Sequence, residues 1–355
     1  MPAPQELAVQ LVLDHIVILV PPSLITNPPE WLATAFHITP GGRHANNLTF
    51  NSLILFRDGV YVELIAFVEG ASEAERRDTR WGRRVEGEIV DFAFTLLPAG
   101  GGLGVSTRGG GGIGVGGIGG GSSGGGGSGG SSGGSSGSSG SGGSGGDSGG
   151  FGPEEVFRQE VQSRVRKVGR EFDTGWEYLD PVAGGRITPG GKELKWAVAV
   201  PLRHQVDAHV KVGDGMVEGE GRLPFWCLDR TPRDWRVPFK SGGAEHVCGA
   251  VGVAGVEVAV KEDGFVKLRR VYESFLGEWF PASAETDKSA KWEVKVPDTV
   301  SSQLTSTLAI RGDLKEEDDM QVRISLRLFT RGPSGVVAGE IAPGRMLEIE
   351  LIHVS

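Results

Sequence analysis

Leu13–Val20 reads LDHIVILV and Val60–Val68 reads VYVELIAFV. In both stretches the side chains on each of the two strand faces are mostly apolar and of types common in β-strands. This pattern is typical of strands that are buried on both sides. Each stretch nevertheless carries an ionisable residue in its middle or near its start, His15 in the first and Glu63 in the second. A buried carboxylate without a partner costs several kcal/mol, so Glu63 needs a cation, a hydrogen-bond donor or a raised pKa.

His15 is the obvious candidate partner for Glu63. Strand parity places His15 on one face with Val17, and Glu63 on one face with Tyr61. If these two faces form the same concave surface, the imidazole and the carboxylate converge. The alternative is a structural hydrogen bond between the two residues in a closed core.

The segments around these two strands complete a β-α-β-β-β unit. An amphipathic helix is expected over Pro29–Phe36, and extended segments follow in LTFNSLILFR, at 48–57, and VYVELIAFV. The pair Asp58-Gly59 between these last two segments is typical of a hairpin turn. We therefore expect residues 10–99 to form a first β-α-β-β-β module.

The same order of elements recurs twice along the chain. A strand at Ile89–Leu97, a helix at Pro153–Val168 and three later strands predict a second module, which continues over residues 151–240. A strand at Val253–Val260, a helix at Gly264–Leu276 and three further strands predict a third, at 245–355. The fold class is therefore α+β, with repeated modules arranged in a mixed sheet.

Residues 100–150 consist almost entirely of Gly and Ser. Such a composition has too few apolar side chains to form a core, which predicts a disordered insertion. Because it separates a strand from its helix, it interrupts the second module and does not divide two domains. A long flexible loop adds only a logarithmic closure term to the free energy of folding.

Composition excludes several functional classes. The net charge of −9 among 355 residues makes nucleic acid an improbable partner. Two cysteines, Cys227 and Cys248, provide no disulfide framework, and no apolar run is long enough to span a membrane. We expect a soluble, cytoplasmic protein that binds a small molecule.

Two polar stretches are candidates for ligand binding. Gly41–Asn51 (GGRHANNLTFN) contains His44, Thr49 and Asn51, which can line a pocket or simply form turns. The second stretch, LDRTPRDWRVP at 228–238, contains Arg230, Arg233 and Arg236 and can bind a carboxylate or phosphate of a ligand, with Arg230 and Arg233 expected to contact it. Surface ion pairs with the acidic remainder of the chain are the alternative.

Taken together, LDHIVILV, GGRHANNLTFN and DGVYVELIAF resemble the glyoxalase-like domain family of the vicinal oxygen chelate superfamily, especially its fungal-type members. This resemblance implies modules that pair into a cupped sheet around one site. In metal-using members the first strand of a module supplies a His and the fourth a Glu. His15 and Glu63 match these ligands, so the resemblance implies a divalent metal, with Glu63 also catalytic.

The other modules depart from the metal pattern. Phe92 stands at the position of His15 in module two, and Cys227 near that of Glu63. In module three Val256 replaces the His, while Glu350 matches the carboxylate. The resemblance therefore implies either a metal-dependent lyase, isomerase or dioxygenase acting on a small molecule, or a metal-free binding protein with the same fold. The sequence leaves open the substrate, the metal and the oligomeric state.

Overall fold

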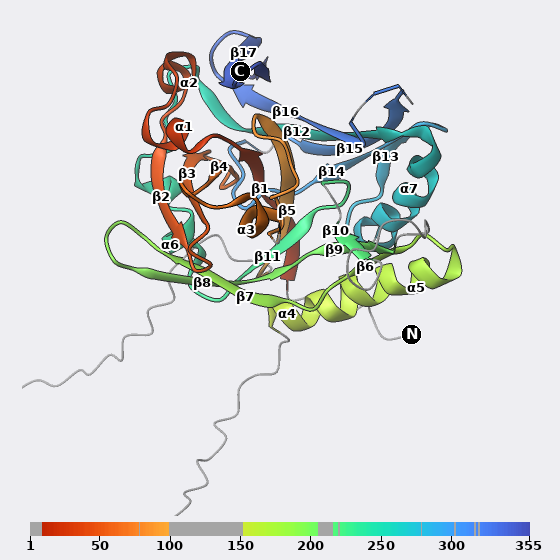
Figure 1. Cartoon of the computed structure of the whole chain (residues 1–355). Coiled ribbons are helices and arrows are strands. Elements are labelled where there is room, and N and C mark those ends of the chain that lie inside the picture. The colour runs from red at the N-terminus through yellow and green to blue at the C-terminus, as the bar shows by residue number, and fades with distance from the viewer. Residues whose placement is uncertain are drawn as a thin grey trace, which may run out of the picture. The chain divides into compact units, whose positions relative to one another are not determined.

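The computed structural model describes residues 9–77, 79–98, 152–204, 216–218, 221–277, 279–301, 303–315, 317–318 and 320–355. The insertion predicted at 100–150 lies outside the described residues. The described part is mixed α+β and rich in strands, as expected (Figure 1). No helix within it is long and apolar enough to cross a membrane.

The first two modules together form a closed barrel of eight strands in the order β1-β4-β3-β2-β7-β8-β11-β5. Parallel pairing of β1 with β4 and of β11 with β5 repeats the same arrangement in each module. The modules meet where β1 pairs with β5 and where β2 pairs with β7. The barrel strands are β1 Val9–Leu19, β2 Thr39–His44, β3 Thr49–Leu55, β4 Tyr61–Phe67, β5 Glu88–Pro98, β7 Val182–Ile187, β8 Glu193–Ala199 and β11 Phe225–Asp229.

The C-terminal part forms a sheet of seven strands in the order β13-β14-β15-β12-β16-β18-β17. Its strands are β12 Ala250–Lys261, β13 Ala282–Glu285, β14 Ser289–Val294, β15 Ser306–Leu314, β16 Val322–Thr330, β17 Gly335–Ala342 and β18 Arg345–His353. We expected only four strands here. β12 pairs in parallel with β15, as β1 does with β4, so β12 to β15 and the helix between them repeat the β-α-β-β-β order, and β16 to β18 follow as additional strands.

Short helices connect the strands of the first module, and longer ones follow the first strands of the later modules. The helical segments are α1 Pro22–Thr26, α2 Glu30–Ala35, α3 Glu73–Arg77, α4 Pro153–Val156, the π-helical η1 Phe157–Gln162, α5 Ser163–Glu171, α6 Arg233–Arg236, the 3-10 helix η2 Phe239–Ser241 and α7 Glu262–Leu276. A small sheet contains β6 Trp176–Tyr178, β9 Pro201–His204 and β10 Met216–Glu218. The helix predicted at Pro153–Val168 corresponds to α4, η1 and α5.

Two apolar clusters divide the core. The larger one joins the outer face of the barrel to the C-terminal sheet, for example through Ile16 and Ile18 on β1 and Val256 and Val258 on β12. The smaller one lies on the interior face of the barrel and contains Val17. Because β1 contributes to both clusters, both of its faces are covered, as its apolar sequence predicts.

Candidate functional site

A cavity of about 270 Å³ opens on the interior face of the barrel. Side chains from both modules line it. They include His15, His44, Thr49, Asn51, Tyr61, Glu63, Arg80, Trp81, Arg186, Trp196, Phe225, Cys227 and Arg236. The wall thus combines aromatic rings with a few charged groups, a composition typical of small-molecule sites.

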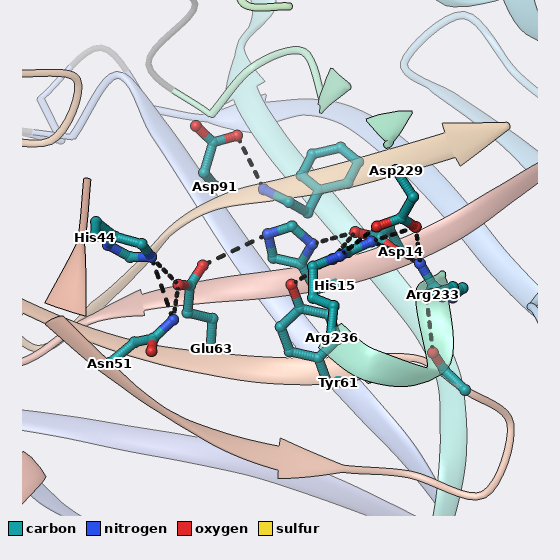
Figure 2. Close-up of polar contacts among 12 residues, drawn as sticks. Asp14, His15, His44, Asn51, Tyr61, Glu63, Asp91, Asp229, Arg233 and Arg236 are labelled. Carbon is teal, nitrogen blue, oxygen red and sulfur yellow. Dashed lines mark hydrogen bonds and ion pairs between the residues drawn. The ribbon is translucent and has the colours of Figure 1, made fainter. Parts of the chain in front are cut away.

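His15 and Glu63 meet in this cavity (Figure 2). In the parallel pair of β1 and β4, Glu63 lies opposite Val17, two residues beyond His15 on the same face. His15 Nε2 lies 3.5 Å from Glu63 Oε2, and the two residues are only 3% and 5% exposed. The convergence expected from strand parity therefore occurs in the structure.

Asp14 holds the other side of the His15 ring. His15 Nδ1 donates a hydrogen bond to Asp14 Oδ2 at 2.6 Å. The pairing of β1 with β5 shifts in register between Leu13 and His15, a bulge that allows these consecutive residues to act on one another. The Nδ1 proton of His15 therefore points to Asp14, and Nε2 is the ring atom near Glu63.

Glu63 accepts further contacts from β2 and β3. Asn51 Nδ2 donates to Glu63 Oε1 at 2.5 Å, and His44 Nε2 lies 3.4 Å from the same oxygen. Thr49 Oγ1 lies 2.8 Å from His44 Nδ1 and fixes that ring. His44, Thr49 and Asn51 therefore all line the cavity, and His44 and Asn51 contact the carboxylate directly.

These contacts keep Glu63 ionised. Burial by itself raises the pKa of the carboxyl group, but hydrogen bonding and charge from His44, the charge of His15 and the Asn51 hydrogen bond outweigh it. The net result is a pKa of about 2. Glu63 is thus a buried anion at neutral pH, and a poor proton acceptor for a weak acid.

The predicted arginines lie outside the cavity. Arg230 Nε donates to Glu154 Oε1 at 2.7 Å, and its side chain is 40% exposed. Arg233 is buried, where it pairs with Asp14 and donates to the carbonyl of Gly59 at 3.0 Å. Neither residue lines the cavity; Arg230 forms an ion pair at the surface, as in the alternative expectation, whereas the ion pair of Arg233 is buried.

Arg236 is the arginine of this stretch that does line the cavity. Its guanidinium bonds Asp14 Oδ2 at 3.0 Å and Asp229 Oδ1 at 2.6 Å, and donates to the Tyr61 hydroxyl at 2.8 Å. Burial raises the pKa of Asp14, but Arg233 and Arg236 outweigh it and hold that pKa well below its ordinary value. The two arginines thus support the carboxylate that orients His15.

The family comparison matches the part of the chain that contains this array. The model of the glyoxalase-like domain family matches residues 13–99. These residues form a glyoxalase-like domain. Asp14, His15, His44, Asn51 and Glu63 all fall within it.

Comparison with other proteins shows distant likenesses. No curated protein matches the chain. A hypothetical protein from Staphylococcus aureus is 12% identical with a TM-score of 0.49, over 96% of this chain and 100% of that one. A xylose isomerase-like TIM barrel/4-hydroxyphenylpyruvate dioxygenase fusion protein is 10% identical with a TM-score of 0.39, over 92% of this chain and 38% of that one.

The second module does not repeat the polar pair of the glyoxalase-like domain. Ala93, not Phe92, lies opposite His15 in the β1–β5 pair. Ala93 belongs to the interior apolar cluster of the barrel, whereas Phe92 belongs to the outer one. The expectation for Phe92 was therefore wrong by one residue, which moves a strand side chain to the other face. Cys227 does line the cavity, and burial raises the pKa of its thiol well above the ordinary value.

The glyoxalase-like domain provides only part of a metal site. Two ligands about 2.1 Å from one cation lie roughly 3.4 Å apart at a tetrahedral angle, close to the 3.5 Å between His15 Nε2 and Glu63 Oε2. Glu63 Oε1, however, is already bonded to Asn51. Among the residues that the structure describes, no group of three or more His, Cys, Asp and Glu side chains is arranged to hold a metal ion. These side chains therefore do not fit a complete resident metal centre.

Proposed function

We propose that the protein binds a small molecule inside the barrel and that Glu63 and His15 contact the polar end of this molecule. The aromatic wall, which includes Tyr61, Trp196 and Phe225, accommodates the apolar part of the ligand. A cytoplasmic location and the absence of a nucleic-acid partner belong to the same proposal, on the grounds of net charge and cysteine use.

One observation supports this proposal above the others, namely the unequal contacts of the two Glu63 oxygens. Oε1 accepts from Asn51, whereas within the described residues Oε2 has only His15 Nε2, at 3.5 Å. A buried anionic oxygen at a cavity wall favours a ligand that donates a hydrogen bond to it, because such charge-assisted bonds are strong. A hydroxyl or an N–H group on the ligand provides this donor.

Phenol and anisole test this contact, because anisole has the same ring but no O–H donor. Their binding is measured by the fluorescence of Trp81 and Trp196, which line the cavity. Glu63→Gln keeps the size of the side chain and removes its charge, so phenol should bind about tenfold more weakly while anisole is unchanged. Glu350→Gln, an exposed strand carboxylate, is the matched control. Unchanged phenol binding in Glu63→Gln contradicts the proposal.

A metal-dependent lyase, isomerase or dioxygenase is the second candidate, and the 3.5 Å separation of His15 Nε2 and Glu63 Oε2 is the observation that favours it. A proton or a cation between these two atoms stabilises their close approach. A divalent metal at this point would take its remaining ligands from water or substrate and would polarise substrate oxygens.

Metal analysis of protein purified without chelators separates the two candidates. The enzyme candidate predicts one equivalent of metal in the wild type, lost in a His15→Ala, Glu63→Ala double variant and retained in His353→Ala, a control on the exposed end of β18. Absence of metal from the wild type, even after incubation with Mn²⁺ or Zn²⁺, would contradict the enzyme candidate and favour metal-free binding.

A further inference from the structure

Arg186 differs from the other arginines of the cavity in its contacts. It is 6% exposed and lines the cavity from β7, a strand of the second module. Across the module boundary it lies opposite His44, the residue on β2 that contacts Glu63. Side chains paired in this way lie on the same face of the sheet, so the guanidinium flanks the polar array of the first module.

Each of the other two arginines already has a carboxylate partner. Arg80 bonds Asp91 Oδ2 at 2.6 Å and 3.0 Å, and Arg236 bonds Asp14 and Asp229. For Arg186 no hydrogen bond or ion pair joins it to any residue in the part of the chain that the structure describes. Burial lowers the pKa of its guanidinium, whereas the charges of Tyr61 and Glu63 raise it less. Arg186 is therefore a buried cation without a bonded counter-charge.

We infer that Arg186 binds a carboxylate of the ligand, so that the protein takes a small monocarboxylate with an apolar body. This inference rests on the proposed function, because it assumes that the barrel cavity is the ligand site. A planar guanidinium binds a carboxylate through two parallel hydrogen bonds, and the low-polarity surroundings strengthen them.

Charge and shape narrow the ligand to this class. Among the described residues, the cavity offers one guanidinium without a hydrogen bond or ion pair, which balances one negative charge. Glu63 lies in the same cavity, so its carboxylate repels the second negative charge of a dianion such as a phosphate monoester. Trp196 and Phe225 form flat apolar walls beside the charged groups, which suits a ring or a short aliphatic body.

Benzoate and benzamide test the assignment, because they share one shape and differ in charge. Titrations use the wild type, Arg186→Gln and Arg186→Lys. Arg43→Gln is the matched control, since Arg43 lies on β2 at the same β2–β7 pair that contains Arg186 on β7, but is exposed. We expect benzoate to bind the wild type at least about tenfold more tightly than benzamide. Arg186→Gln should abolish this preference by weakening benzoate alone, Arg186→Lys should keep part of it, and Arg43→Gln should keep all of it.

Three results overturn the assignment. These are equal binding of the two probes to the wild type, an equal change for both probes in Arg186→Gln, or no saturable binding of benzoate up to about 10 mM, well beyond the range of specific small-ligand sites. The Glu63→Gln titration with phenol and anisole runs alongside. If Arg186→Gln loses the benzoate preference while Glu63→Gln binds phenol as the wild type does, the Glu63 contact alone is refuted. If Arg186→Gln keeps the preference while Glu63→Gln binds phenol more weakly, the Arg186 assignment alone is refuted.

Discussion

Glu63 on β4 and Glu350 on β18 are both carboxylates on strands, but Glu63 is buried and Glu350 is exposed. Every residue of β4 is buried, so Glu63 lies within a barrel whose two faces are both covered. In β18 buried and exposed residues alternate, and Glu350 is exposed, opposite Arg327 on β16. The local patterns YVELIAF and LEIELIH already contain this difference, since only the second alternates apolar with polar residues.

The difference shows what closing the sheet contributes. A closed barrel has an interior that its own strands cover, so a polar residue there must find partners among neighbouring strands. Glu63 finds them in His15, His44 and Asn51. The C-terminal sheet is open and packs one face on the core, so Glu350 faces solvent and needs no such partners.

The largest expected effect is the loss of folding stability when the Glu63 carboxylate is removed, compared with removal of the Glu350 carboxylate. Glu63→Ala should lower the free energy of unfolding by about 3 kcal/mol, because it leaves Asn51 and His44 without their acceptor. Glu350→Ala should change it by less than about 0.5 kcal/mol. Urea unfolding at pH 7 measures both, and equal effects would remove the distinction between the two regions.

Asp58 tests the connection between the barrel and the C-terminal sheet. It lies in the turn before β4 and accepts a hydrogen bond from the backbone of Val253 on β12 at 2.7 Å. Burial raises its pKa to about 7, against the lowering effect of hydrogen bonds from Val253 and Val60.

Because an unfolded Asp titrates near 3.8, the folded state binds this proton more tightly. The contribution of this proton to the free energy of unfolding is therefore complete below pH 3.8 and is lost as the pH rises through about 7. Wild-type unfolding free energy should fall by about 3 kcal/mol from pH 5 to pH 8 through this group. Asp58→Asn should flatten the fall, and an identical pH profile in the variant argues against a proton on Asp58.

Glu63 should produce the opposite dependence at lower pH. Its pKa is depressed to about 2 in the folded state, so its contribution is present above the ordinary value of 4.5 and is lost as the pH falls toward 2. Between pH 7 and pH 3 this amounts to about 2 kcal/mol. Glu63→Gln should lack this component and Glu350→Gln should retain it, as measured by thermal or urea unfolding across the range.

The smallest effect is expected for the Gly/Ser segment, which belongs to neither region. Replacing residues 100–150 by a short linker should shift the melting temperature by no more than about two degrees, because the segment has almost no apolar side chains to bury. Binding of phenol and benzoate should be unchanged. A much larger fall in melting temperature would mean that the segment packs against the remainder.

Sequence pattern alone predicted the modular α+β fold and the buried strands at LDHIVILV and VYVELIAFV, and it gave the convergence of His15 with Glu63 in a concave site as one of two possible arrangements. These follow from local properties, since strand parity and apolar composition are properties of a few consecutive residues. It predicted less well the C-terminal sheet, where it missed β13, β15 and β17; β13 has only four residues, and β17 reads GVVAGEIA without a long apolar run.

Only the tertiary structure decided which groups surround His15 and Glu63. Asp14 and Arg236 are 222 residues apart and bond each other, while Arg230, six residues before Arg236, lies outside the cavity. Arg186 reaches the site because β7 pairs with β2 across the module boundary. Charge pairing depends on distances of a few ångströms between segments that are far apart in the sequence. The register between the strands of the barrel sets these distances, and no single strand encodes this register.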